Sequence, residues 1–243
     1  MSAPFTLPIR DDLAGIASYG APQLDVPARL NVNENPFALP DDLVEAMGRG
    51  VAAVAAGLNR YPDRDADELR AALADYLRRE SGAHVDAAQV WVANGSNEVM
   101  HHLFLAFGGP GRLAMTFDPT YSMYPEYARD TFTAYETVPR REDFTVDVPA
   151  AVAAIVDRRP TLVLLTSPNN PTGWTLTRDE QEAILAHCRR TGTWIVADEV
   201  YERIWFGPGR AAPSFLDIAE PADRLVVAQS FSKTFLMTSW RLG

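Results

Sequence analysis

The 243-residue chain has very little cysteine, no long apolar run and no excess of basic residues. Cys188 is its only cysteine, which excludes an internal disulfide and suits a reducing compartment. No apolar run approaches the length of a membrane span, and the first residues lack the basic and apolar segments of a signal peptide. With 22 basic and 32 acidic residues, the net charge of −10 argues against nucleic-acid and anionic-membrane partners. We therefore expect a cytoplasmic protein.

Histidine is also scarce, and its spacing does not favour a metal site. His101 and His102 are adjacent, so they face different sides of a predicted helix, while His84 and His187 stand alone. A zinc site needs more ligands at suitable spacing, so we expect no metal.

Apolar patterns with helical and strand periods alternate after an arm rich in proline and turn formers at residues 1–40. The pattern predicts helices at 41–56, 66–79, 98–107, 148–156 and 177–191. Apolar runs predict strands at 89–93, 113–117, 132–138, 161–166, 193–197 and 225–229. This alternation predicts an α/β three-layer sandwich with a mostly parallel sheet, formed by residues 41–243.

Polar clusters follow the predicted strands. They lie at residues 94–97, 118–121, 167–173, 198–201 and 230–233. Ligands of parallel α/β sheets bind outside the carboxyl ends of the strands, so the five clusters predict one site.

Lys233 lies between small hydroxyl residues just after an apolar run, and Arg241 follows eight residues later. A lysine there can form a Schiff base with an aldehyde cofactor if desolvation and nearby cationic charge keep its amine neutral. Ser230, Ser232 and Arg241 could then bind the phosphate of that cofactor through hydrogen bonds, the arginine with charge assistance. The alternative is an ordinary lysine that points into solvent.

The segment of Gly95, Ser96 and Asn97 joins a predicted strand to a predicted helix. Free backbone amides at such a turn bind anions such as phosphate. The alternative interpretation is a plain turn with an N-cap.

Asp198 ends a predicted strand, where its carboxylate can pair with a protonated heterocyclic nitrogen. Tyr201 lies three residues further on and could reach a phenolic oxygen of the same ring. The alternative is that Asp198 and Glu199 form an acidic N-cap pair on a helix.

Two other clusters contain ring and amide groups. Tyr121 offers a flat face for stacking on an aromatic ring, or is a core tyrosine. The segment 167–173 holds two prolines and a glycine that restrict its backbone, and Asn169 and Asn170 supply amide donors. Such restriction favours a functional turn over a plain surface turn.

Together these motifs resemble the pyridoxal-phosphate-dependent aminotransferases of fold type I, class I/II, over about residues 19–243. The most specific segments are 167–173, 198–201 and 230–241, which follow the family's order and spacing. The N-terminal half, including 30–37 and 59–63, is similar to histidinol-phosphate aminotransferases, particularly actinobacterial ones. Residues 198–243 look more like aspartate- or aromatic-type aminotransferases.

The resemblance implies a role for each site residue around pyridoxal 5′-phosphate. Lys233 would form the Schiff base and carry a proton between substrate and cofactor, and Asp198 would pair with the ring nitrogen. Tyr121 would stack on the ring, while Asn170 and Tyr201 would bind its oxygen. The phosphate ligands would be Ser96, Asn97, Ser230, Ser232 and Arg241.

The resemblance also implies partners. Tyr61 would reach the cofactor phosphate of a neighbouring subunit, which implies a homodimer. Tyr19 and Asn170 would contact the substrate, with Tyr19 near its phosphate end. The implied reaction moves an amino group from L-histidinol phosphate to 2-oxoglutarate in histidine biosynthesis. The alternatives are an aromatic- or aspartate-type aminotransferase and a non-catalytic cofactor-binding fragment.

Family members are longer than this chain. In them, the segment that matches Arg241-Leu-Gly243 leads into an antiparallel strand and a C-terminal small domain that binds the substrate carboxylate. We therefore expect residues 41–243 to be an incomplete large domain, with the small domain absent and with weak or no activity. A dinucleotide-binding domain is disfavoured, because no Gly-x-Gly-x-x-Gly follows the first predicted strand.

Overall fold

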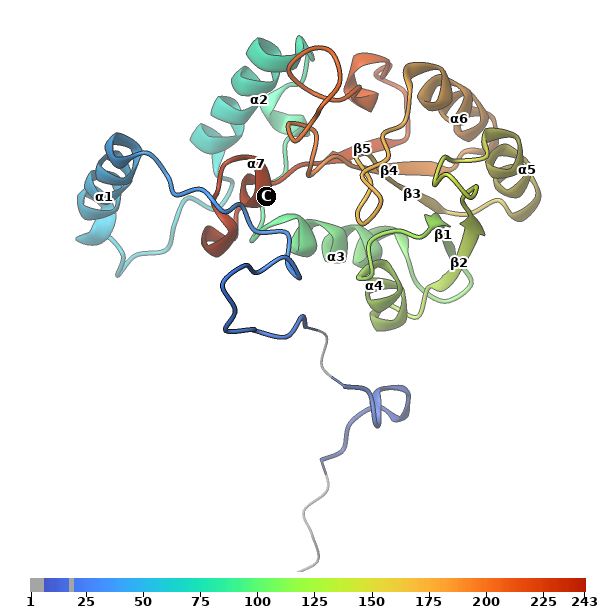
Figure 1. Ribbon diagram of the computed structural model, residues 1–243, viewed down its shortest axis with the longest axis horizontal. Helices are drawn as coiled ribbons and strands as arrows, with labels where there is room; N and C mark the ends of the chain where they lie inside the picture. Colours follow the sequence, from blue (N-terminus) through green and yellow to red (C-terminus); the bar gives the residue numbers. More distant parts are fainter. Residues whose placement is uncertain (1–6, 18–19) are drawn as a thin grey trace, which may run out of the picture. The chain divides into compact units, whose positions relative to one another are not determined.

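The computed structural model describes residues 7–17 and 20–243 and divides the chain into two units, 1–34 and 35–243 (Figure 1). The described part of the first unit is irregular apart from a 3-10 turn at Asp11–Leu13. One contact inside it joins the side-chain amide of Asn31 to the Pro22 carbonyl at 2.7 Å. The remaining elements belong to the second unit.

The second unit contains a five-stranded sheet in which all neighbouring strands are parallel. Its strands are β1 (Leu113–Asp118), β2 (Ala134–Pro139), β3 (Leu162–Thr166), β4 (Trp194–Asp198) and β5 (Leu225–Ala228). Their spatial order is β2-β1-β3-β4-β5. The sheet confirms the predicted parallel α/β fold, and five of the six predicted strands are present.

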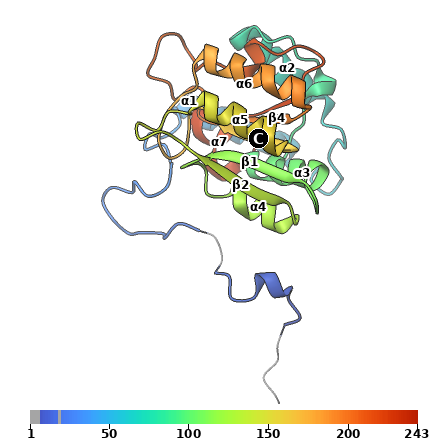
Figure 2. The same cartoon turned by 90° about the vertical axis from the view of Figure 1, so that its right-hand side faces the viewer.

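Helices cover both faces of this sheet (Figures 1 and 2). The helices of the second unit are α1 (Asp41–Ala55), α2 (Asp67–Ser81), α3 (Ser96–Phe107), α4 (Tyr124–Asp130), α5 (Val148–Arg158), α6 (Arg178–Thr191) and α7 (Phe231–Thr234). Short 3-10 turns lie at Ala87–Gln89, Phe215–Asp217 and Thr238–Trp240. Residues of α5 and α6 pack on one face, and residues of α3 and α4 pack on the other. The result is the predicted three-layer arrangement.

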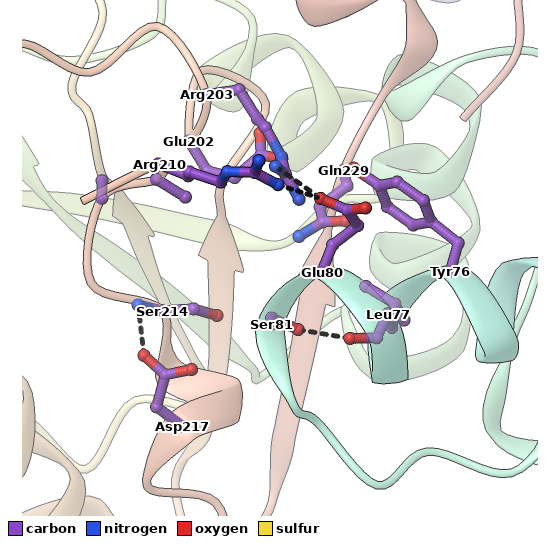
Figure 3. Close-up of a pocket in the computed structure, with 12 residues that line it drawn as sticks. Tyr76, Leu77, Glu80, Ser81, Glu202, Arg203, Arg210, Ser214, Asp217 and Gln229 are labelled. Carbon is purple, nitrogen blue, oxygen red and sulfur yellow. Dashed lines mark hydrogen bonds and ion pairs between the residues drawn. The ribbon is translucent and has the colours of Figure 1, made fainter.

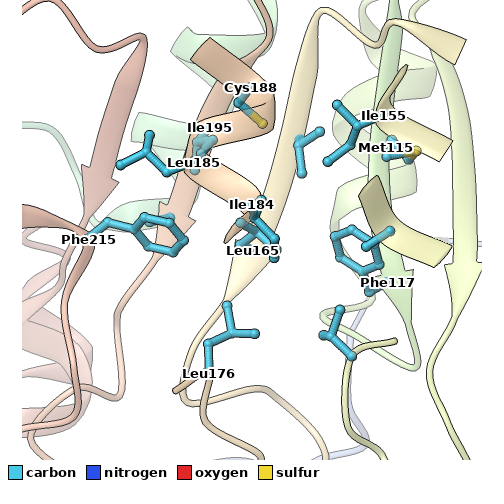
Figure 4. Close-up of a cluster of buried hydrophobic side chains, with 14 of the residues drawn as sticks. Met115, Phe117, Ile155, Leu165, Leu176, Ile184, Leu185, Cys188, Ile195 and Phe215 are labelled. Atoms are coloured by element: carbon cyan, nitrogen blue, oxygen red, sulfur yellow. The ribbon is translucent and has the colours of Figure 1, made fainter. Parts of the chain in front are cut away.

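Strand β3 takes part in the core on both faces. Its residue Leu165 packs in the same cluster as Ile155 of α5 and Ile184 of α6 (Figure 4), and Val163 belongs to that cluster too. The alternate residues Leu162 and Leu164 belong to the opposite cluster. Successive side chains of a strand point to opposite faces, so a continuous apolar run serves two cores. Each of these fully buried side chains contributes about 1.5–3 kcal/mol to folding through the hydrophobic effect.

Helix α6 has clear sequence signals at both ends. At its start, the Thr177 backbone N–H donates to Glu180 Oε2 at 2.7 Å and the Glu180 N–H donates back to Thr177 Oγ1 at 3.3 Å, which is a capping box. At its end, Gly192 adopts a left-handed conformation with φ of 73° and closes the helix. The local sequence therefore specifies both boundaries of this helix.

The predicted strand at 89–93 is wrong. Gln89 closes a 3-10 turn and the residues after it are irregular. Ala93 and Gly243 exchange two backbone hydrogen bonds, of 2.9 and 3.1 Å, which is the pattern of a hydrogen-bonded antiparallel pair. No second pair extends this contact within the described residues, so the apolar run does not form a ladder, and Trp91 remains 69% exposed.

The sequence analysis assigned no element to α4, which begins with the pair Tyr124-Pro125. It is only seven residues long, so its helical period is weak. None of the helices described here is long and apolar enough to cross a bilayer. In the same residues, no cluster of histidine, cysteine and acidic side chains could hold a metal ion.

Candidate cofactor site

The polar segments after β3, β4 and β5 lie side by side at the carboxyl edge of the sheet. The Ser167 N–H donates to the Asp198 carbonyl at 3.0 Å, which joins the segment after β3 to the end of β4. The Glu199 N–H donates to the Ala228 carbonyl at 2.9 Å, which joins the end of β4 to the end of β5. The predicted convergence of these clusters at one edge is therefore confirmed.

Asp198 is the central polar residue of this edge. Its side chain is buried, with 6% of the residue exposed, and Oδ2 accepts a hydrogen bond from the Tyr124 hydroxyl at 2.7 Å. Oδ1 is also buried, and it has no hydrogen-bond partner among the described residues. Burial raises the pKa of Asp198 to about 6, and the hydrogen bonds from Tyr124 and from the Val200 backbone act in the opposite direction. The geometry thus leaves one buried acceptor oxygen of Asp198 without a donor among the described residues.

Tyr124 connects Asp198 to a chain of hydroxyl groups. The Tyr124 hydroxyl lies 2.6 Å from Thr166 Oγ1, and Thr120 Oγ1 lies 3.3 Å from the same atom. Burial, followed by the nearby Asp198 charge, raises the pKa of Tyr124 well above its usual value. The sequence analysis did not assign a function to Tyr124. Its position three residues after Tyr121 in a polar cluster was the available signal.

A second group of residues surrounds the N-terminus of α3. Gly95, the N-cap, has φ of 84°, a conformation that favours glycine. A Cβ built on Gly95 would lie 2.7 Å from Nη2 of Arg241, so the guanidinium occupies the space of the missing side chain. Arg241 Nη1 also donates to Ser232 Oγ at 3.4 Å and to the Thr238 carbonyl at 3.1 Å.

This arrangement suits an anion. The N-terminus of a helix carries partial positive charge and unpaired backbone N–H groups, and here a guanidinium lies next to it. An anion between the two would be stabilised by both, and a phosphate is well matched to them. Ser96 begins the helix, and Asn97 follows with its Oδ1 accepting from the Tyr121 hydroxyl at 3.3 Å. Three predicted phosphate-binding residues, Ser96, Ser232 and Arg241, therefore lie near one another.

Ser230 differs from Ser232. It is the N-cap of α7, where its Oγ accepts from the Ser232 N–H at 3.1 Å and donates to the Leu242 carbonyl at 3.2 Å. Its hydroxyl is thus engaged in holding the turn together. In the present arrangement, Ser230 supports the anion site by fixing the position of Ser232.

Four other predicted site residues are half-buried at strand ends. Tyr121 follows β1 and makes an edge-to-face contact with Tyr124, with ring centroids 5.6 Å apart. Asn170 follows β3, Tyr201 follows β4, and Lys233 lies in α7 just after β5. Each thus extends from the edge that also carries Asp198.

The two remaining predicted residues do not join this group. Tyr61 follows α1 and is fully exposed, so no residue of the described chain covers its side chain. Tyr19 lies outside the described residues. Their predicted roles toward a partner subunit and a substrate stay predictions.

Glu199, next to Asp198, is buried without any exposed surface, and the sequence analysis assigned it no separate role. Its Oε2 accepts from Ser214 Oγ at 2.6 Å, and its Oε1 accepts from the Phe215 N–H at 2.9 Å. Burial raises the pKa of Glu199 to about 8, while the two donors act to lower it. The alternative of an N-cap pair is wrong, because a turn rather than a helix follows these residues.

A pocket of about 200 Å³ lies between α2 and the segment after β4 (Figure 3). The Glu80 carboxylate projects into it, 3.2 Å from Arg203 and 3.8 Å from Arg210. The charge of Glu80 is therefore compensated within this pocket. None of the predicted site residues lines it.

Comparison with known proteins places this geometry in a family. The family model for aminotransferase class I and II matches residues 27–243. The chain is 48% identical to the histidinol-phosphate aminotransferase of Bifidobacterium longum, over 100% of this chain and 64% of that protein. It is 51% identical to that of Thermobifida fusca, over 98% of this chain and 62% of that protein. The chain thus spans less than two thirds of the length of these relatives.

Solved structures agree with this assignment. The fold is similar to aspartate aminotransferase from Thermus thermophilus with maleate, with a TM-score of 0.76 and 28% identity over 88% of this chain and 55% of that chain. A methionine aminotransferase from Escherichia coli gives a TM-score of 0.79 and 26% identity over 93% of this chain and 63% of that chain.

The coverage also bears on residues 198–243, which were expected to resemble aspartate- or aromatic-type enzymes. The similarity to histidinol-phosphate aminotransferases extends over the whole chain and is not confined to the N-terminal half. From the family match, the fold and the polar residues at the sheet edge, we conclude that the chain belongs to the class I and II aminotransferases.

Proposed function

We propose that this chain is the cofactor-binding part of a pyridoxal-phosphate-dependent aminotransferase. The proposal is that it acts on L-histidinol phosphate and 2-oxoglutarate and makes imidazole-acetol phosphate and glutamate. The names of the curated relatives support this donor, since they are histidinol-phosphate aminotransferases. The single buried Cys188 supports a reducing compartment, and we propose the cytoplasm.

The observation that carries the proposal is the unpartnered oxygen of Asp198. A buried carboxylate oxygen without a donor costs free energy, so its presence at a sheet edge indicates a ligand that supplies an N–H group. The protonated ring nitrogen of pyridoxal phosphate is such a donor. The anion site at Ser96 and Arg241 supplies the matching contact for the phosphate at the other end of the same ligand. The described residues therefore fit the cofactor.

Each residue would then have a defined task. Bound pyridoxal phosphate supplies an aldehyde and a ring that withdraws electrons. Asp198 would keep a proton on the ring nitrogen, because its own negative charge stabilises that proton. Lys233 would hold the cofactor's aldehyde carbon through Nζ, and once the substrate's amine has taken that place, the freed Nζ would accept and return a proton. Tyr121 would lie against the ring face, and Asn170 and Tyr201 would donate to the ring oxygen.

Helix α1 supports the proposal of a homodimer. Its residues Leu43, Val51 and Val54 recur at helical spacing, yet the helix contains no buried residue. Val54 is 59% exposed, so this apolar stripe has no cover within the described chain. We propose that a second copy covers it, and that the exposed Tyr61 reaches the partner's cofactor phosphate from the same region.

A spectroscopic and product assay tests the cofactor and the substrate. The purified chain is mixed with pyridoxal phosphate, and we expect visible absorption that is lost in Lys233→Ala. Addition of L-histidinol phosphate should convert the cofactor to its amine form in a single turnover, measured by chromatography, faster than aspartate or phenylalanine. Absorption that is identical in Lys233→Ala would contradict the cofactor assignment, and faster conversion by aspartate or phenylalanine would contradict the donor.

Sedimentation tests the dimer. We expect the wild-type chain to sediment as a dimer, and Val51→Asp combined with Val54→Asp to sediment as a folded monomer. Val156→Asp on α5 is a matched control, because Val156 is also exposed, at 48%. The dimer proposal fails if the wild-type chain is a monomer at every concentration, or if the α1 variant remains a dimer.

A further inference from the structure

The hydrogen bonds around Tyr124 set the state of Asp198. A tyrosine hydroxyl has one proton to donate, whereas an ionised carboxylate can only accept. At 2.7 Å from Oδ2, the Tyr124 hydroxyl donates to Asp198, and its oxygen is then left to accept from Thr166 Oγ1 at 2.6 Å. If Tyr124 instead donated to Thr166, Asp198 would have to be protonated to keep its contact. The chain of donors therefore favours the ionised form of Asp198.

Tyr124 is also held rigidly. It has no exposed surface, and its ring packs in the core cluster that includes Met100 and Leu164. Because one carboxylate oxygen is tied to this fixed hydroxyl, the carboxylate cannot rotate freely about its axis. The second oxygen, Oδ1, is thereby held in one direction, and it is the oxygen without a partner.

We propose that Tyr124 is the positioning residue for Asp198. It would hold the carboxylate ionised and direct Oδ1 toward the ring nitrogen of the cofactor. Tyr124 does not touch the ligand in this proposal and acts through Asp198. The inference rests on the proposed cofactor, since the role of Oδ1 depends on a ligand with a ring N–H.

The test compares two ligands that differ at one ring atom. Pyridoxamine phosphate carries the ring nitrogen, and its 1-deaza analogue has C–H in that place and cannot pair with Asp198. Neither forms a Schiff base with Lys233, so titration calorimetry of the apoprotein measures non-covalent binding of each. The ratio of the two affinities isolates the contact with Oδ1, because the phosphate and ring-face contacts are common to both.

We expect Tyr124→Phe to weaken the binding of pyridoxamine phosphate by about tenfold. The reason is that Oδ1 of Asp198 is no longer held toward the ring nitrogen, so its charge-assisted hydrogen bond becomes weaker. The affinity for the deaza analogue should change less than about twofold, since this ligand makes no hydrogen bond to Asp198. The Tyr124 hydrogen bond lowers the pKa of Asp198, so the preference for pyridoxamine phosphate should be lost at a higher pH in the variant on acidification. Tyr135→Phe is the matched control, because Tyr135 packs against the same core cluster but lies on β2, away from β4 in the strand order. It should change neither affinity.

Equal weakening of both ligands by Tyr124→Phe would overturn the inference, because an unchanged ratio of affinities indicates a purely structural role. No weakening of either ligand would overturn it too. If Tyr124→Phe does not fold, as judged by circular dichroism, Thr166→Val decides between the same two outcomes, because it removes the hydroxyl that hydrogen-bonds to Tyr124. Failure of the proposed function has a different signature, because the wild-type protein would then show no preference for pyridoxamine phosphate over the deaza analogue.

Discussion

The two sides of the end of β4 carry neighbouring buried carboxyl groups in different surroundings. Asp198 faces α4, where one oxygen binds Tyr124 and the other has no partner in the described chain. Glu199 faces the segment that leads to the Phe215–Asp217 turn, and donors of that segment occupy both of its oxygens. Burial alone therefore does not identify a functional acid. The difference lies in whether the chain itself completes the hydrogen bonds, as it does for Glu199 and does not for Asp198.

The largest expected effect is on the Glu199 side. Glu199→Ala leaves the Ser214 hydroxyl and the Phe215 N–H buried without an acceptor, so the free energy of unfolding should fall by about 2–4 kcal/mol. Urea unfolding of the apoprotein, followed by circular dichroism, measures this change. Asp198→Asn is the matched variant and should stay within about 1 kcal/mol of wild type, because it removes a buried charge that its surroundings satisfy only in part. Equal losses of unfolding free energy in the two variants would contradict the proposed difference between Glu199 and Asp198.

The next effect is on the Asp198 side and concerns ligand affinity. Asp198→Asn removes the charge that pairs with the ring nitrogen, so pyridoxamine phosphate should bind about 10–100-fold more weakly. Glu199→Gln should stay within about threefold of wild type, since its side chain does not face the ligand. Titration calorimetry of the apoproteins gives both values. A large loss of affinity in Glu199→Gln would mean that both acids serve the site.

The pH dependence of stability sharpens the same comparison. The pKa of Glu199 is raised from 4.5 to about 8 by folding, so the folded state binds the proton more tightly than the unfolded state. The free energy of unfolding should therefore fall as pH rises through this window, by at most about 1.4 kcal/mol per pH unit. Asp198 contributes in the same direction only up to about pH 6. Unfolding measured between pH 6.5 and 8 thus reports chiefly on Glu199, and the free energy of unfolding should depend less on pH in Glu199→Gln than in the wild-type chain.

The smallest expected effect concerns a single donor to Glu199. Ser214→Ala removes one of the two hydrogen bonds and should lower the free energy of unfolding by about 1 kcal/mol. The affinity for pyridoxamine phosphate should not change. Chemical unfolding and calorimetry on the same preparation measure both quantities, and a loss of affinity would link the Ser214 side to the ligand.

The sequence predicted those parts of the fold whose signals are local. The capping box at Thr177 and the glycine at 192 mark the ends of α6, and alternating polar clusters mark the ends of β3, β4 and β5. It did not predict α4, because a seven-residue helix carries too short a period. It placed a strand at 89–93 because an apolar run reads as a strand whether or not a partner strand lies beside it.

The candidate site shows the same division. Lys233, Asp198 and Arg241 belong to motifs that are readable from residue type and spacing. The contact between Tyr124 and Asp198 joins residues 74 positions apart. The hydrogen bond from Ser214 to Glu199 depends on the loop between them folding back onto the end of β4. Hydrogen-bond partners of buried groups are set by tertiary packing, so the distinction between Asp198 and Glu199 becomes visible only in the folded chain.

Strand β3 has a consequence for how this fold comes apart. Its leucines and valine alternate between the two cores. Unfolding of either core therefore exposes the strand against which the other core packs. The two helical layers should then melt in a single cooperative transition, and amide hydrogens of β3 should be among the last to exchange with solvent. The carboxyl end of the same strand supports the Tyr124–Thr166 contact, which ties the geometry of the site to the most persistent part of the molecule.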